Sequence, residues 1–117
     1  MIVLLSMMTS CEKDYLIPIK SVIPDSVSFA ANVIPIFEKS CIASGCHNTG
    51  GIAPDLTKDN AYNDLMLYGM VDTLNPASSI LYARMTSKGS PMPPSGLLKA
   101  GEDELILKWI EQGAKNN

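Results

Sequence analysis

Apolar residues recur at helical spacing in several stretches of the chain, and the clearest of these lies between residues 28 and 40. Its apolar positions follow one another every three or four residues, which places them on one face of a helix. These positions are Phe29, Val33, Ile36 and Phe37, followed by Ser40. Ser28 precedes them as a candidate N-cap. Pro35 predicts either a kink or a regular helix that begins near it.

The last predicted helix runs from about Gly101 to Gln112. Acidic residues at positions 102–104 suit its N-terminal end, where the helix dipole favours negative charge. Gly113 is a natural C-cap, because glycine readily adopts the left-handed conformation in which many helices end. One face of this helix is formed by Ile106, Trp109, Ile110 and Gly113. We therefore expect Trp109 to lie in the core.

Two shorter helices are predicted between these, joined by loops that contain glycine and proline. The first lies within residues 60–69 and is expected to face inward through Tyr62, Leu65, Met66 and Tyr68. The second begins at residues 75–78, where either Asn75 or Ser78 is expected to cap it. It continues through Ile80, Leu81, Arg84 and Met85. The pattern predicts a helical domain with long loops.

Length and charge limit the classes of function. The chain has 117 residues, which suits one domain. Its net charge of −3 and its pI near 4.9 argue against a nucleic-acid partner, which requires a basic face. Aromatic residues make up only 6% of the chain, so a buried cofactor would add apolar volume to a core that is poor in rings.

Candidate chemistry is concentrated in the stretch from Cys41 to His47, which reads C-I-A-S-G-C-H. A cysteine pair followed at once by histidine is the haem-attachment pattern, although the usual gap holds two residues and this one holds four. We expect the extra residues to bulge outward, since Ala43, Ser44 and Gly45 are small.

Met92 is the second candidate ligand, because it lies in the stretch G-S-P-M-P-P. A thioether is a soft ligand that suits haem iron opposite a histidine. The flanking prolines stiffen the loop and so preorganise the sulfur atom. Met70 and Met85 are the competing candidates, but they lack flanking prolines and read more simply as core residues.

These features resemble the c-type cytochrome domain family. More narrowly, they are similar to small bacterial domains with a C-x-x-x-x-C-H motif, an M-P-P loop and a W-I-x-x-G-A terminal helix, and the likeness covers residues 28–114. The resemblance implies an all-α, cytochrome c-like fold of three to five short helices around one covalent haem c. Cys41 and Cys46 would form the thioethers, and His47 and Met92 would be the axial ligands of the iron.

The resemblance implies further roles as well. The carbonyl of Pro54 would accept the Nδ1 proton of His47, and Trp109 would pack against the first helix near the haem. Arg84 is expected either to reach a haem propionate or to be a solvated surface residue. The function implied is one-electron transfer with redox partner proteins. No constellation of catalytic residues predicts an enzyme, although domains of this kind also serve as accessory parts of larger redox complexes.

Two other interpretations of the motif stay open. In the first, Cys41, Cys46 and His47 bind zinc, although a fourth ligand is lacking and zinc sites prefer separated ligand pairs. In the second, Cys41 and Cys46 form a disulfide in an exported interaction module. That disulfide would leave His47 and Met92 without roles.

The N-terminus resembles a bacterial lipoprotein signal. Residues 1–10 are apolar or small and end directly before Cys11, the expected lipidation site. The alternative is a frayed apolar terminus with an incidental Cys11. Residues 12–27 contain two prolines and predict an extended tether or, alternatively, an arm packed on the domain at 28–117. These features predict a lipid-anchored protein of the bacterial envelope, on the periplasmic or cell-surface side.

Overall fold

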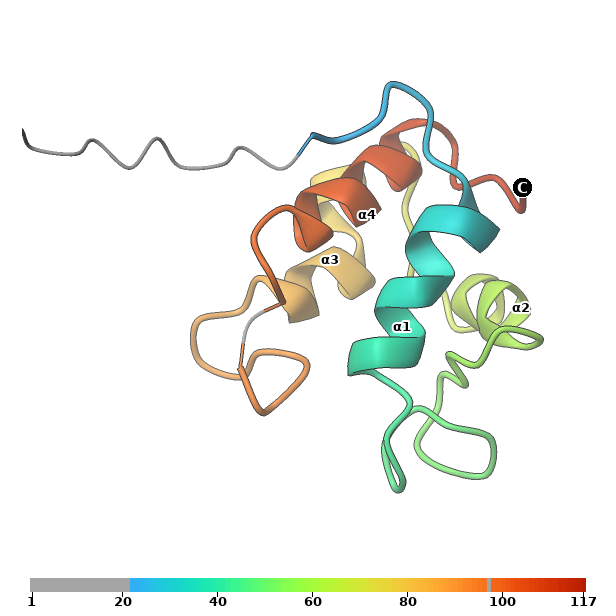
Figure 1. The fold of residues 1–117 in the computed structure, drawn as a ribbon, viewed down its shortest axis with the longest axis vertical. Coiled ribbons are helices and arrows are strands. Elements are labelled where there is room, and N and C mark those ends of the chain that lie inside the picture. Colours follow the sequence, from blue (N-terminus) through green and yellow to red (C-terminus); the bar gives the residue numbers. More distant parts are fainter. Residues whose placement is uncertain (1–21, 97) are drawn as a thin grey trace, which may run out of the picture.

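The computed structural model describes residues 22–96 and 98–117. The expected lipoprotein signal, Cys11 and most of the expected tether lie outside this range. The elements, in chain order, are η1 (Phe29–Val33), α1 (Ile34–Ser40), α2 (Ala61–Leu67), η2 (Pro76–Ser78), α3 (Ile80–Met85) and α4 (Glu102–Glu111) (Figure 1). Because the described ranges contain helices and no strand, the all-α prediction is confirmed. None of the helices in these ranges has the length and apolarity needed to cross a bilayer.

The first helical stretch begins at Ser28, as predicted. The Ser28 hydroxyl accepts a hydrogen bond from the Ala31 amide at 3.1 Å, which satisfies one of the free donors at the helix start. The five residues of η1 form a π-helical turn, and the regular helix α1 begins at Ile34. Pro35 therefore lies in the first turn of α1, where its missing N–H removes no intrahelical bond.

Helix α4 ends in a Schellman motif. The Gly113 amide donates to the Ile110 carbonyl at 2.9 Å, and the Ala114 amide donates to the Trp109 carbonyl at 3.0 Å. Gly113 has φ +96°, which confirms it as the residue that ends the helix. It is exposed, so its expected place on the buried face of α4 is wrong; the other three residues predicted there are buried.

The two central helices differ from the prediction. In α2 only Ala61 and Leu65, one turn apart, are buried, and Tyr62 is half-buried. Met66 and Tyr68, which were predicted to face inward, are 38% and 49% exposed. Met66 directly follows Leu65 and so lies off the face that Ala61 and Leu65 share, and Tyr68 is the C-cap residue after the last turn. The second stretch is not one helix, since Ser79 adopts an extended conformation between η2 and α3.

The predicted caps of this stretch are borne out only in position. Asn75 occupies the N-cap position of η2, but its side chain makes no cap bond there. Ser78 is the last residue of η2, so its predicted capping role is wrong. The buried Ser79 hydroxyl bonds the backbone of Asp72: it accepts from the amide at 2.8 Å and donates to the carbonyl at 3.3 Å. This pair of bonds ties the loop before η2 to the start of α3.

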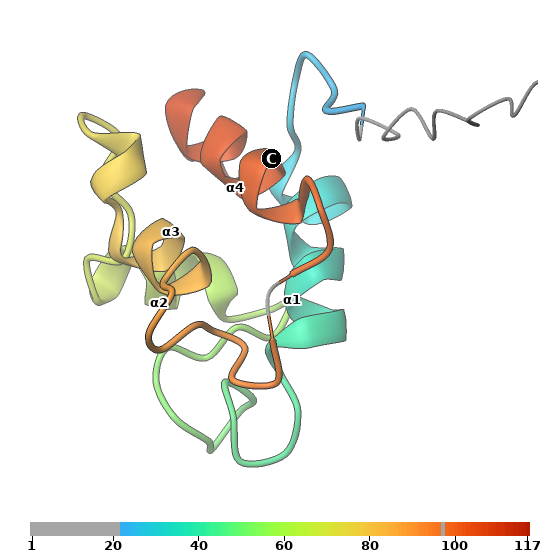
Figure 2. The ribbon, with the colours of Figure 1, turned by 90° about the vertical axis from the view of Figure 1, so that its left-hand side faces the viewer.

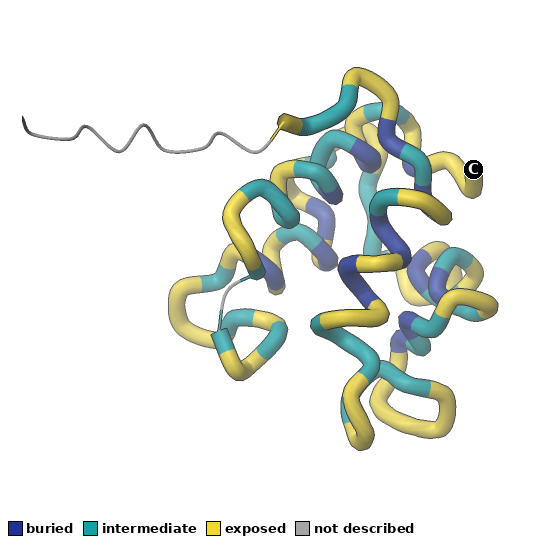
Figure 3. The backbone as a smooth tube through the Cα atoms, in the orientation of Figure 1, coloured by how far each residue is buried: buried dark blue, intermediate teal, exposed yellow. Residues whose placement is uncertain are grey.

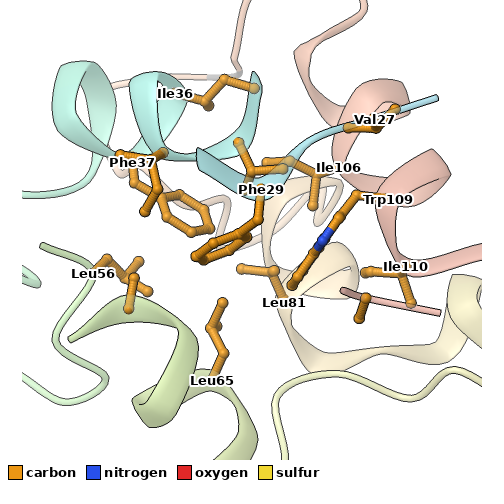
Figure 4. Close-up of a cluster of buried hydrophobic side chains, with 14 of the residues drawn as sticks. Val27, Phe29, Ile36, Phe37, Leu56, Leu65, Leu81, Ile106, Trp109 and Ile110 are labelled. Atoms are coloured by element: carbon orange, nitrogen blue, oxygen red, sulfur yellow. The ribbon is translucent and has the colours of Figure 1, made fainter. Parts of the chain in front are cut away.

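The core lies between η1, α1 and α4, with α2 and α3 completing it (Figures 2 and 3). Phe29 lies between the other rings of the core. Its ring centroid is 4.9 Å from that of Trp109 and 6.3 Å from that of Phe37 (Figure 4). The ring of Tyr62 lies 5.4 Å from it, also between centroids. Trp109 is completely buried, and its indole N–H donates to the Lys115 carbonyl at 2.9 Å. The expected packing of Trp109 against the first helical stretch is confirmed.

The chain enters this core earlier than the expected boundary at residue 28. Val27 is 2% exposed, and its amide donates to the Gln112 side chain at 2.9 Å. The same Gln112 side chain donates to the Asp25 carbonyl at 2.6 Å. Val22, by contrast, is 94% exposed. Residues 25–27 therefore belong to the packed domain.

The last residue described completes this end of the molecule. Asn117 accepts hydrogen bonds from the Phe29 amide through its side chain and from the Ala30 amide through its carbonyl, both at 2.9 Å. The Ser28 hydroxyl donates to the same carbonyl at 2.9 Å. The segments on either side of the helical core are thus held together at the start of η1.

Candidate functional site

Helix α1 leads directly into the cysteine–histidine motif. The Cys41 amide donates to the Phe37 carbonyl at 2.8 Å as the last bond of the helix. The Cys41 carbonyl then accepts the His47 amide at 3.0 Å, which closes the intervening residues into a loop. Both ends of the motif are therefore fixed to one helix end.

The four residues between the cysteines form a compact outward turn. The Cys46 amide donates to the Ala43 carbonyl at 2.9 Å, and Gly45 has φ +79°. These are features of a type II β-turn, which requires positive φ at its third residue. Ala43, Ser44 and Gly45 are all exposed, so the predicted outward bulge is confirmed.

The His47 ring is held by two backbone carbonyls. Its Nδ1 lies 2.9 Å from the Ile52 oxygen and 3.0 Å from the Pro54 oxygen. Carbonyl oxygens only accept hydrogen bonds, so Nδ1 carries the proton and donates it to them. In the neutral ring this leaves Nε2 with a free lone pair, the form in which histidine binds metals. The predicted role of Pro54 is confirmed in this geometry; the contribution of Ile52 was not predicted.

Short backbone bonds shape the loop that carries these carbonyls. The Ile52 amide donates to the Cys46 carbonyl, and the Leu56 amide donates to the His47 carbonyl, both at 2.7 Å. The Gly51 amide donates to the Asn48 carbonyl at 2.8 Å. A Cβ at Gly51 would overlap the Cys46 carbonyl, so the loop requires glycine there.

The motif and the proline-flanked loop meet at one cavity of about 310 Å³, at the lower end of the usual range for ligand sites. Cys41, His47 and Met92 line it together with apolar side chains. These include Phe37, Ile52, Leu56, Ile80, Leu81 and Leu98. An adjoining hollow of about 290 Å³ shares Cys41, His47, Ile52 and Met92 and is also lined by Cys46. All four residues predicted to hold the haem therefore lie around this connected space.

Three methionines line the larger cavity, but they differ in their settings. Met85 is 6% exposed and belongs to the core, and Met70 packs against that core. Met92 is 38% exposed and lies in the loop, where its amide donates to the Arg84 carbonyl at 3.0 Å. This bond fixes the methionine loop to the end of α3. Arg84 itself is exposed at the edge of the cavity.

Burial makes the Cys41 thiol less acidic than an exposed thiol. Desolvation, with smaller contributions from Cys46 and Glu102, raises the pKa of Cys41 from 9.0 to about 11. Cys41 and Cys46 are both free thiols. Within residues 22–96 and 98–117 no group of three or more His, Cys, Asp or Glu side chains is placed to hold a metal ion.

No family model matches the chain, nor does any curated protein or solved structure. The assignment of the site therefore depends on its own residues. Two hydrogen bonds that shape the site could not be predicted from residue types, because their acceptors are backbone carbonyls, those of Ile52 and Arg84. The donor set nevertheless fits haem c: two free thiols, one imidazole with an available Nε2, and thioethers at an apolar cavity.

Proposed function

We propose that this chain is a one-electron transfer protein that binds a single covalent haem c. Cys41 and Cys46 would hold the haem through thioether bonds, and His47 and Met92 would be the ligands of its iron. The observation that carries the proposal is the His47 ring, whose Nδ1 donates to two carbonyls while Nε2 stays available beside an apolar cavity. A histidine serving only as a core residue would not need its tautomer fixed in this way beside a cavity shared with Cys41 and Met92.

Each residue has a defined task in this function. The carbonyls of Ile52 and Pro54 orient the His47 ring and increase the electron density at Nε2. The Arg84 carbonyl holds the backbone of Met92, so that the thioether is presented from an anchored loop. When bound, the haem would supply an iron that changes oxidation state by one electron. Because the chain would supply both of these iron ligands, the role would be electron transfer rather than catalysis, whether alone or within a larger redox complex.

The proposed location is the bacterial envelope. Covalent haem c is attached outside the cytoplasm, and the lipoprotein-like signal ending at Cys11 leads to the same compartment. Two or more acyl chains anchor a protein stably, whereas one alone binds reversibly. A lipidated Cys11 would therefore hold the domain at a membrane, where redox proteins are its partners.

Extraction with acid and acetone tests the proposal directly. Protein produced with a haem-attachment system should keep its colour after extraction and show the spectrum of haem c. Cys41→Ser and Cys46→Ser should each weaken attachment, and Cys11→Ser provides the control because it removes a thiol outside the motif. Complete extraction of haem from the wild type would overturn the proposal. An uncoloured protein with a Cys41–Cys46 disulfide would favour the interaction module instead.

A further inference from the structure

The loop after His47 contains a carboxylate that accepts four hydrogen bonds. One Asp55 oxygen accepts from the amide and the hydroxyl of Thr57, the former at 2.9 Å. The other accepts from the Thr49 hydroxyl at 2.8 Å and from the Asn60 amide group at 3.0 Å. These donors precede and follow Asp55 in sequence, so the carboxylate closes the loop on itself.

The backbone of Asp55 is fixed as well. Its amide donates to an Asp64 oxygen at 2.7 Å, and Asp64 lies in the first turn of α2. The loop is thus anchored to a helix on one side and, through the Leu56–His47 backbone bond, to the motif on the other. The bonds to Thr57, and then those to Thr49 and Asn60, lower the pKa of Asp55 from 3.8 to about 2, so it is ionised at neutral pH.

Pro54, which precedes Asp55, supplies one of the two carbonyls that hold His47. The peptide unit between Pro54 and Asp55 carries two polar groups, the Pro54 carbonyl and the Asp55 amide, and each makes a hydrogen bond. The Asp55 amide donates to Asp64, and the carbonyl accepts from His47. Any rotation of this peptide plane therefore weakens both hydrogen bonds at once.

We infer that Asp55 is a positioning residue that fixes the tautomer and orientation of His47 through the Pro54 carbonyl, and thereby lowers the reduction potential of the bound haem. The second part of this inference rests on the proposed function; the first part does not. A firmly oriented carbonyl draws the Nδ1 proton and makes Nε2 more basic. A more basic ligand stabilises the oxidised iron, so loosening the carbonyl raises the potential.

The test compares Asp55→Asn with Asp59→Asn. The carboxamide introduced at position 55 would turn a donor toward either Thr57 or the Thr49–Asn60 pair, which breaks the network with little change in size. Asp59 is an exposed carboxylate of the same loop, so its substitution makes the same change in charge. Any shift specific to Asp55→Asn is therefore not a general electrostatic effect.

Two measurements are made on each full-length variant. Because His47 is the chain's only histidine, nitrogen NMR of the haem-free protein reports its tautomer without assignment. We expect Nδ1–H in the wild type and in Asp59→Asn. Asp55→Asn should loosen the loop that carries both the Ile52 and the Pro54 carbonyls, so we expect a mixture of tautomers there. Potentiometry of the haem-loaded protein should show a positive shift in Asp55→Asn that exceeds the shift in Asp59→Asn.

Equal tautomer and potential in the two folded variants would overturn the inference. If Asp55→Asn does not fold, Thr49→Val replaces it, since this change removes a single bond to Asp55 and should move both readouts in the same direction by less. No movement in Thr49→Val would then also overturn it. A protein that takes up no haem but shows the tautomer change would refute the proposed function and leave the positioning role intact.

Discussion

Replacing the cavity methionines one at a time should separate the proposed iron ligand, Met92, from the methionines that belong to the core. Met85 is 6% exposed, and truncating a buried methionine to alanine costs about 2–5 kcal/mol of folding free energy. Met92 is 38% exposed, so its packing should contribute less to the free energy of unfolding, about 1–2 kcal/mol. Stability and iron ligation should therefore respond to different residues.

Leucine is the sharper substitution, because exchanging methionine for leucine preserves volume and costs under about 1.5 kcal/mol in a core. We expect Met92→Leu to abolish the weak near-infrared charge-transfer band that iron–methionine ligation gives in the oxidised protein. Met85→Leu and Met70→Leu make the same chemical change in the same cavity and should keep the band.

The assay combines this absorption band with urea unfolding followed by circular dichroism. Met85→Ala should lower the free energy of unfolding by about 2–5 kcal/mol and keep the band. A band that survives in Met92→Leu and disappears in Met85→Leu or Met70→Leu would refute the reasoning. In that case a core methionine would be the ligand, and the proline-flanked loop would have another role.

Three further predictions concern the motif and its loop. Gly45→Ala should lower the free energy of unfolding in urea by about 1–2 kcal/mol, because Gly45 has φ +79°, which alanine adopts only with strain. The added Cβ meets no atom within 4 Å, so the cost should come from the backbone alone. Gly89→Ala, which is equally open but has no positive φ, should be near neutral. The pKa of Asp55 is lowered from 3.8 to about 2 on folding, so its stabilisation is complete above pH 3.8 and disappears as the pH falls toward 2. When the free energy of unfolding is measured against pH, Asp55→Asn should lack this loss and Asp59→Asn should show it. Because burial raises the pKa of Cys41 to about 11, its alkylation by iodoacetamide in the haem-free protein should be slow at pH 8 and rise steeply toward pH 11; fast alkylation at pH 8 would contradict its burial.

Strong local patterns predicted the parts of the fold they govern. The bounds of α4 follow from an apolar face, acidic residues at its start and Gly113 at its end, and the structure places them within one residue of the prediction. The cysteine–histidine motif was equally visible in the sequence, because haem attachment would need particular residue types at fixed spacing. The break at Ser79 was not visible, because it depends on hydrogen bonds to the backbone of Asp72.

The second layer of the site was only partly predictable. The family resemblance implied that the Pro54 carbonyl accepts the His47 proton. Nothing in the sequence indicated the same role for the Ile52 carbonyl, since any residue carries a carbonyl. Asp55 did have one: the sequence Asp55-Leu56-Thr57 is typical of an Asx-turn, in which aspartate accepts from the backbone two residues on. Its connection to His47 became visible only when the fold brought these loop residues together.

The hydrogen bonds between Asn117 and the start of η1 determine which side of the domain can be presented to other molecules. Residues 22–27 and the C-terminal residues lie at one pole, whereas the loops of residues 41–56 extend from the opposite pole (Figure 1). Whatever precedes residue 22 is therefore joined to the domain at the far side from His47. A partner approaching the cavity meets no steric obstruction from that junction.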